Sequence, residues 1–277
     1  MTQSECRRSL RRSEVFTSEA KPVVLTIAGL DPSGGAGIVA DIKTISALGC
    51  FPAAALTSIT FQNTTGVFGA EHQTAETLRA QVEPIVQDLS VAAAKTGMLP
   101  TAEIVAEVAR LFSEANLPAP VVDPVVVATS GDVLIDEEAF QILKSQLFPL
   151  ARIVTPNIPE AEKLAGFAIE TEDDMRRAAE VIQSMGARAV LVKGGHKQVR
   201  AGEAVDVLFG ENAIFTEFRS EYLDVGEVHG SGCTLSAAIA ACLGRGLTLE
   251  DAVGAAKEYV NNAIRSAPRI GHGARPL

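Results

Sequence analysis

The sequence predicts an α/β fold, with a mainly parallel central sheet flanked by helices. Nearly continuous apolar runs such as Val23–Ala28 and Ala189–Val192 are typical of strands covered on both faces. Stretches with helical periodicity separate these runs, as parallel strands require. Two strand-like runs on either side of Gly210-Glu211-Asn212 predict a hairpin, so we expect an antiparallel edge.

The same patterns give each element in chain order. The strands are expected at Val23–Ala28, Ala53–Thr60, Val91–Ala94, Pro120–Val122, Arg152–Val154, Ala189–Val192, Val205–Phe209 and Ala213–Phe218. The helices are expected at Ile38–Leu48, Thr74–Gln87, Thr101–Phe112, from Ala161, at Asp173–Met185, after Gly230 and at Leu249–Ser266.

Length and composition indicate one domain. The chain has 277 residues, 47% of them hydrophobic, which supplies a sizeable core. Residues 1–20 carry four arginines among polar residues and are expected to form a disordered tail, with a single domain over 21–277. We found no repeat or low-complexity linker that would mark a second domain.

The net charge of −10 argues against nucleic acid or an anionic membrane surface as a partner, because both need a basic footprint. No apolar run reaches the length of a membrane span, and the N-terminus lacks the apolar core of a signal peptide. The cysteines Cys6, Cys50, Cys233 and Cys242 form no C-x-x-C pair, so a cytoplasmic location fits best.

A glycine-rich turn, Gly230-Ser231-Gly232-Cys233, leads into an apolar helix near the C-terminus. Backbone N–H groups and the positive end of the helix dipole meet there, which predicts an anion site. The same field is expected to lower the pKa of Cys233 below the reference of about 8.5. The alternative is a plain loop before a core helix, with Cys233 a small buried hydrophobe like Cys242.

A second glycine-rich loop, from Gly29 to Gly37, follows the first strand. Gly35 and Ala36 stand where a P-loop needs Lys and Ser or Thr, so a P-loop is excluded. The dinucleotide fingerprint matches as a pattern but begins six residues past the strand end and lacks the acidic residue for a ribose. A Rossmann dehydrogenase is therefore disfavoured.

Polar residues follow several strands, where ligands of parallel sheets bind. Gln62 can both donate and accept, which suits a heteroaromatic ring, or it caps a turn. Asp123 can position Mg²⁺, or cap the chain at Asp-Pro. Asn157 and Glu160 can add to such a site, or form a helix cap. Lys193 can reach a phosphate, or be an ordinary exposed lysine.

Taken together, the motifs resemble one family. They are Gly29-Leu-Asp-Pro-Ser-Gly-Gly-Ala-Gly37, Gln62-Asn-Thr64, Lys95-Thr-Gly-Met-Leu99, Asn157-x-Pro-Glu160, Lys193-Gly-Gly-His196 and Gly230-Ser-Gly-Cys233. In this order, from about Pro22 to about Gly273, they resemble the hydroxymethylpyrimidine/phosphomethylpyrimidine kinases of thiamine biosynthesis, in the ribokinase-like superfamily.

The resemblance implies a three-layer ribokinase-like fold that uses ATP and Mg²⁺ and forms a homodimer. It assigns the pyrimidine to residues at Asp41, Gln62, Gly29, Ala36 and Val125. It assigns Mg²⁺ and its waters to Asp123, Asn157 and Glu160, and ATP to Lys193, Gly195, Gly230 and Gly232. The catalytic group is Cys233 in place of the superfamily's usual aspartate base, with Gly230, Ser231, Gly232 and Lys193.

Three functions follow as hypotheses. The first is phosphorylation of 4-amino-5-hydroxymethyl-2-methylpyrimidine and of its monophosphate; the others are a pyridoxal or pyridoxine kinase and a catalytically silent pyrimidine-binding protein. Ser231 and Val228 depart mildly from the family pattern, and the ending after Gly271 is shorter than usual. Whether Gly66–Gln73 forms a lid and whether a monovalent cation is needed stay open.

Overall fold

The computed structural model describes residues 21–126, 135–195 and 202–277. The predicted tail at 1–20 and His196 of the Lys193 motif lie outside these residues. The strands are β1 Val23–Leu30, β2 Phe51–Asn63, β3 Gly66–His72, β4 Val91–Thr96, β5 Val121–Val122, β6 Ile153–Val154, β7 Val190–Lys193, β8 Glu203–Phe209, β9 Phe215–Glu221, β10 Val228–His229 and β11 Arg275–Pro276. The helices are α2 Gly37–Ala47, α3 Ala75–Asp88, α4 Ala102–Glu114, α5 Glu137–Ile142, α6 Ile158–Ala165, α7 Glu172–Gln183, α8 Ser231–Gly244 and α9 Leu249–Ser266.

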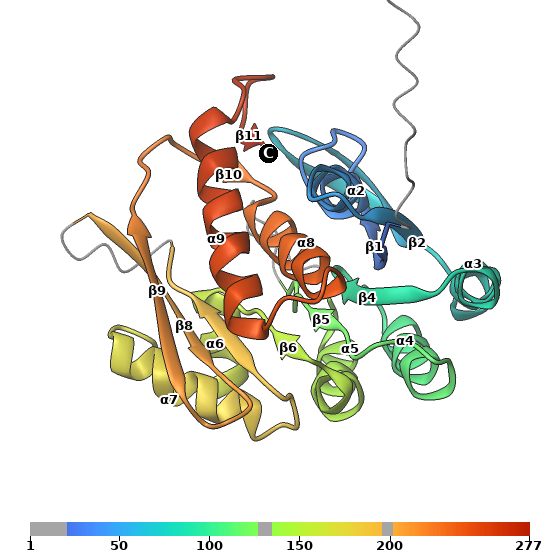
Figure 1. Ribbon diagram of the computed structural model, residues 1–277. Coiled ribbons are helices and arrows are strands. Elements are labelled where there is room, and N and C mark those ends of the chain that lie inside the picture. Colours follow the sequence, from blue (N-terminus) through green and yellow to red (C-terminus); the bar gives the residue numbers. More distant parts are fainter. Residues whose placement is uncertain (1–20, 127–134, 196–201) are drawn as a thin grey trace, which may run out of the picture.

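The central sheet has the strand order β3-β2-β1-β4-β5-β6-β7-β8-β9 (Figure 1). From β2 to β7 the neighbouring strands are parallel. The expected antiparallel hairpin is present as β8 and β9, and β8 also pairs antiparallel with β7. The predicted parallel sheet with an antiparallel edge is thus confirmed.

The other edge is antiparallel as well, which the sequence patterns did not predict. The segment considered as a lid contains β3, which pairs with β2 from Ser58↔His72 to Asn63↔Gly66. Thr64 and Thr65 form the turn between them. The side chains of β3 are half-buried or exposed, so the apolar pattern that reveals a core strand is missing there.

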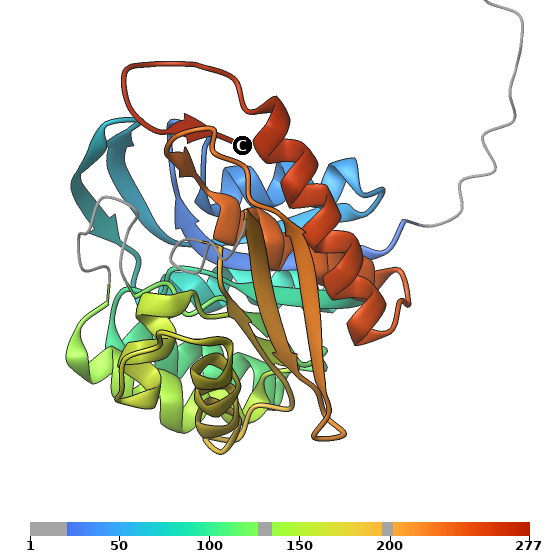
Figure 2. The same ribbon diagram turned by 90° about the vertical axis from the view of Figure 1, so that its left-hand side faces the viewer.

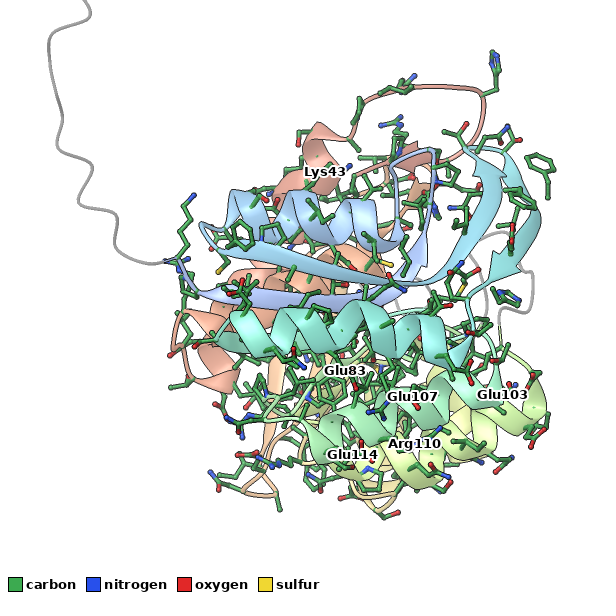
Figure 3. All side chains as sticks on the ribbon, turned by 90° about the vertical axis from the view of Figure 1, so that its right-hand side faces the viewer. Lys43, Glu83, Glu103, Glu107, Arg110 and Glu114 are labelled. Carbon is green, nitrogen blue, oxygen red and sulfur yellow. The ribbon has the colours of Figure 1, made fainter. Side chains whose placement is uncertain are left out.

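Helices cover both faces of the sheet, and a separate core fills each side (Figures 1 and 2). One core packs α2, α8 and α9 on the sheet, with Ile45, Ile239 and Val253 among its fully buried side chains. The other packs α3 to α7, with Leu78, Val108 and Met175. Figure 3 shows the outer side of α3 and α4, where charged side chains such as Glu83 and Glu114 point outward.

Capping residues explain most helix starts. Thr74, Thr101, Thr171 and Thr248 each accept a hydrogen bond from a backbone N–H of the first turn. Helix α6 begins at Ile158 rather than at Ala161, because Asn157 caps it and Pro159 is tolerated in the first turn. No helix among the described residues is long and apolar enough to cross a membrane.

Candidate active site

A cavity of about 620 Å³ opens at the carboxyl ends of the parallel strands. Its wall includes Gly29 at the end of β1, Gln62 at the end of β2, Asp123 after β5, Lys193 at the end of β7, and the first turn of α8. The topology explains this, because parallel strands end at the same edge of their sheet. Of the predicted site residues, all except Asp41 line this cavity.

The predicted glycine turn does open a helix. Gly230 precedes α8 with a φ of 86°, and a Cβ there would lie 1.8 Å from the Gly35 carbonyl oxygen, so a side chain is excluded. No side chain caps α8, so the first N–H groups of this helix have no side-chain partner, and the residues that carry them line the cavity. A Cβ on Gly232 would lie 3.2 Å from Lys193 Nζ. Gly230, Ser231 and Gly232 therefore bring backbone N–H groups and an ammonium to one place, as an anion site requires.

Cys233 lies in the first turn of α8 and lines the cavity. Its expected low pKa is wrong, since burial raises the pKa of the Cys233 thiol to about 11. Lys95 is the strongest influence in the opposite direction, and the carboxylates of Asp41 and Asp123 add to the increase. Withdrawal from water thus outweighs the neighbouring cation, and the thiol is protonated at neutral pH.

Lys193 and two carboxylates gather opposite this turn. Lys193 Nζ lies 3.1 Å from Asp123 Oδ1, and Asp123 also accepts hydrogen bonds from Thr155 and Ser236. Burial opposes the charge of Lys193, but Asp123 and Glu160 outweigh it and raise the pKa of this lysine. Glu160 is almost fully buried, and burial raises its pKa to about 7, while Lys193 acts against the increase.

Asn157 and Glu160 are a helix cap as well as cavity residues. The Asn157 side chain accepts from the Glu160 N–H at 2.9 Å, and the Glu160 carboxylate accepts from the Asn157 N–H at 2.9 Å. This reciprocal pair holds both side chains at the start of α6. The structural alternative considered for these residues is therefore present, and it fixes them beside Asp123 without closing them off from the cavity.

The donor set fits Mg²⁺ bound partly through water. Mg²⁺ in phosphate-transferring sites takes one or two protein carboxylates and keeps several waters. Asp123 and Glu160 are two carboxylates that line one cavity, and each has a Coulombic effect on Lys193. No group of three or more His, Cys, Asp or Glu within the described ranges forms a ready metal cluster. A hydrated ion that also binds phosphate is the kind that this set suits.

Glycines and apolar side chains form another part of the cavity wall. Gly29, Ala36 and Val125 line the cavity together with Met98 and Gln62. A Cβ on Gly29 would lie 2.7 Å from the Met98 methyl carbon, so glycine lets the methionine pack directly against β1. Met98 belongs to a quoted motif but had no predicted role. Its place beside Gly29 depends on β1 and β4 being neighbours, which the spacing alone does not give.

Asp41, which was predicted to contact the substrate, is not among the residues that line the cavity. It is fully buried, and its carboxylate accepts from Thr26 Oγ1 at 2.6 Å and from Lys95 Nζ at 3.0 Å. Burial opposes the charge of Lys95, but Asp41 outweighs it and raises the pKa of this lysine. Asp41 therefore influences the site electrostatically: its carboxylate pairs with Lys95 and adds to the raised pKa of Cys233.

Asp31 is a site residue that the sequence reasoning missed. It lines the cavity and its carboxylate accepts from Ser33 N, Gly35 N and Ala36 N at 2.8, 3.0 and 2.9 Å. His229 Nε2 lies 3.2 Å from Asp31 Oδ2. Burial opposes ionisation, but hydrogen bonds from His229, Ser33 and Gln62 hold the pKa of Asp31 well below its usual range.

An ionised carboxylate only accepts hydrogen bonds, so each neighbour of Asp31 must present a donor. Gln62 meets this condition with its amide nitrogen, so its amide oxygen is left as a hydrogen-bond acceptor in the cavity wall. Such a wall suits a ring that carries an amino group.

A second buried ion pair, also missed from the sequence, lies beside the loop that follows Lys193. Lys257 Nζ lies 2.7 Å from Asp206 Oδ2, and Asp206 Oδ1 accepts from the Gly194 N–H at 3.0 Å. A Cβ on Gly194 would lie 2.1 Å from the Val205 carbonyl oxygen, so the loop after Lys193 packs directly on β8. This pair fixes the start of the loop that carries Gly195.

Comparison with known proteins places the chain in a family. Residues 31–277 match the family described as phosphomethylpyrimidine kinase. A hydroxymethylpyrimidine/phosphomethylpyrimidine kinase of Streptomyces coelicolor is 44% identical over 256 residues, which cover 92% of this chain and 93% of the relative. A thiamine biosynthesis bifunctional protein ThiED of Geobacter sulfurreducens is 45% identical over 254 residues, and the chain spans 51% of its length.

The fold agrees with this result. An ADP complex of Bacillus subtilis pyridoxal kinase superposes with a TM-score of 0.85 at 38% identity, covering 93% of this chain and 96% of that one. The expected ribokinase-like architecture is thereby confirmed.

Proposed function

Since the chain belongs to the phosphomethylpyrimidine kinase family of phosphotransferases, we propose that it transfers a phosphoryl group from ATP to 4-amino-5-hydroxymethyl-2-methylpyrimidine and to its monophosphate, in thiamine biosynthesis. One observation carries the proposal. A single cavity is lined both by the acceptor wall at Gln62 and by the anion site at Gly230–Cys233. A ring bound at the acceptor wall can present its hydroxymethyl group toward the anion site.

Phosphoryl transfer needs in-line positioning and neutralisation of charge more than covalent chemistry. Lys193, Gly195 and the N–H groups of Gly230, Ser231 and Gly232 are assigned to the ATP phosphates. Asp123, Asn157 and Glu160 would hold Mg²⁺ and its waters, and the ion would neutralise phosphate charge there. Because Lys193 is already paired with Asp123, its ammonium is shared between that carboxylate and the phosphates.

Cys233 is the proposed base of the first transfer. It would accept the proton of the hydroxymethyl oxygen as that oxygen attacks the terminal phosphorus of ATP. With the pKa of the free thiol near 11, only a small fraction is ionised at neutral pH, and Lys95 is the cation that favours that fraction. The ion pair of Lys95 with Asp41 fixes this cation below α8.

The second transfer has a different demand. The nucleophile is then a phosphate oxygen, which is already ionised near neutral pH. No proton has to be removed, so Cys233 is expected to matter less. The same cradle serves both steps if the monophosphate occupies the cavity between Gln62 and Gly232.

A vitamin B6 kinase is a second candidate, because the superposed Bacillus subtilis structure is a pyridoxal kinase. The acceptor wall set by Asp31 and Gln62 favours an aminopyrimidine over a ring without an amino group. Comparison of kcat/KM for the pyrimidine, its monophosphate and pyridoxal, with Mg²⁺ and ATP, decides between the candidates. Higher kcat/KM for pyridoxal than for both pyrimidines would contradict the proposal.

Two further assignments accompany this function. We infer a cytoplasmic enzyme, supported by the free thiols of Cys50, Cys233 and Cys242, which suit a reducing compartment. We also infer a homodimer from the family resemblance. Light scattering coupled to gel filtration tests the second point, and a monomeric mass would contradict it.

A further inference from the structure

The segment Gly271–Pro276, here named the C-terminal strap, joins the turn between β2 and β3 to the strand that leads into α8. It contacts the turn between β2 and β3 through Thr64, because Ala274 N donates to Thr64 O at 2.9 Å and Gly273 N to Thr64 Oγ1 at 3.3 Å. A Cβ on Gly273 would lie 1.8 Å from Thr64 O, so the two backbones are in direct contact. Figures 1 and 2 show this end of the chain beside the β2–β3 hairpin.

The other end of the strap joins the lead-in to α8. Strand β11, Arg275–Pro276, pairs in parallel with β10, Val228–His229, and Arg275 N donates to Glu227 O at 2.9 Å. Pro276 is buried, and its Cβ would be 3.0 Å from a Cβ placed on Gly35. Lys43 of α2, labelled in Figure 3, donates to the carbonyl oxygens of Gly34 and Leu277. The end of the chain is thus held at three places: the turn between β2 and β3, the lead-in to α8, and the region of Gly35 and Lys43.

These places adjoin residues that line the cavity. Thr64 follows Gln62 by two residues, and His229 directly precedes Gly230. The loop that contains Gly35 also contains Asp31, which contacts both His229 and Gln62. The strap therefore closes a ring of contacts, from the acceptor wall to the anion site and back through Asp31.

We propose that the C-terminal strap is a positioning element for phosphoryl transfer, which holds the Gln62 wall at a fixed separation from the Gly230–Cys233 turn. The inference rests on the proposed function. Strands β2 and β10 belong to different sheets, and the strap bonds to Thr64 just after β2 as well as to β10. Loss of the link changes where the ring lies relative to the phosphates, and small misplacements of reacting groups are costly.

Gly273→Ala tests the proposal, with Gly66→Ala as the matched control. Gly273 is exposed, so the substitution disturbs the contact with Thr64 and not the core. Gly66 lies in the β2–β3 hairpin that Gly273 contacts. It has no positive φ, and a Cβ there would meet nothing within 4 Å. We expect Gly273→Ala to lower kcat/KM for the pyrimidine by roughly tenfold to a hundredfold. Binding of a non-hydrolysable ATP analogue and the melting temperature should stay near the control values.

Thr64→Ala is the gentler second variant, because it removes the Oγ1 acceptor and keeps the Thr64 carbonyl. It should also lower kcat/KM for the pyrimidine, but by less than Gly273→Ala does. Equal kcat/KM in Gly273→Ala and Gly66→Ala would overturn the proposal. So would an equal loss of affinity for the pyrimidine and the ATP analogue, which indicates a general structural defect. A wild-type enzyme that neither binds nor phosphorylates the pyrimidine would instead refute the proposed function, and the strap's role with it.

Discussion

Lys193 Nζ lies 3.1 Å from Asp123 Oδ1 in the cavity wall, and the same ammonium also interacts electrostatically with Glu160. Burial raises the pKa of Glu160 to about 7, although Lys193 acts against the increase. Part of the Glu160 carboxyl population is then protonated at neutral pH without ligands. Mg²⁺ bound beside it would favour the ionised form.

The first prediction concerns this proton. Binding of Mg²⁺ with a non-hydrolysable ATP analogue at pH 7 should release a fraction of a proton, because Glu160 ionises as the metal binds. Calorimetry in two buffers with different ionisation enthalpies measures that release. Glu160→Gln should abolish it, and an unchanged proton count in that variant would remove Glu160 from the metal site.

The second prediction concerns Cys233 as a base. Cys233→Ala should lower the rate of the first phosphorylation by roughly 10²–10⁴, the usual range for loss of a general base. The phosphorylation of the monophosphate should fall much less, since its nucleophile needs no deprotonation. Single-turnover rates with each substrate test both statements, and Cys242→Ala, at a buried position outside the cavity wall, is the control. Equal losses in the two steps would contradict a role in proton removal.

The third prediction concerns pH. A pKa of about 11 leaves the Cys233 thiol mostly protonated over the whole neutral range, so the ionised fraction rises with every step in pH. The first-step kcat/KM should therefore increase continuously from pH 7 to about pH 9, without a plateau. In Cys233→Ala this slope should disappear. A plateau below pH 8 in the wild type would show that the thiol ionises more easily than its burial indicates.

The fourth prediction concerns the orientation of the Gln62 amide. Asp31→Asn replaces an acceptor-only group by one that also donates, which permits Gln62 to turn its amide nitrogen toward the cavity. The preference for the pyrimidine over pyridoxal, measured as a ratio of kcat/KM, should fall by roughly tenfold. Ser33→Ala removes one hydrogen bond to Asp31 and keeps the carboxylate, so its ratio should equal that of the wild type.

Asp31→Asn should also change acid stability. Because the pKa of Asp31 is depressed in the folded protein, its carboxylate stabilises the fold above the unfolded pKa of about 3.9 and loses this effect as pH falls. The variant should melt earlier than the wild type at pH 7, and the gap should shrink as pH drops below about 4. A gap that is independent of pH would contradict the assigned ionisation.

Much of the fold follows from local sequence patterns. The apolar run at Val23 and the apolar periodicity of Leu249–Ser266 each mark an element that is present, and the helix bounds at Leu249 and Ser266 agree. Strand β3 was not predicted because it is an edge strand whose side chains are half-buried or exposed. The start of α6 was misplaced because its cap combines Asn157 with a proline in the first turn.

The site was less predictable, since burial decides what its residues do. Gly230 has a local backbone reason, a φ of 86° before α8, that a glycine-rich turn in the sequence indicates. The positions of Asp41 and Lys95 do not: both are sealed between α2, β1 and β4, which only the folded chain brings together. Burial at the cavity wall raises the pKa of Cys233, whereas the helix terminus alone predicts the opposite. Asp31 was within a quoted motif, but its partner His229 is 198 residues away.

The purified protein should phosphorylate an aminopyrimidine that binds in this cavity. The direct measurement is mass spectrometry of the products formed from 4-amino-5-hydroxymethyl-2-methylpyrimidine, Mg²⁺ and ATP by the purified protein, with ADP release followed in parallel. We expect the monophosphate to appear first and the diphosphate after it, and Cys233→Ala to accumulate little of either while still converting added monophosphate. Release of no ADP above the rate without pyrimidine, with no phosphorylated pyrimidine formed, would contradict the account.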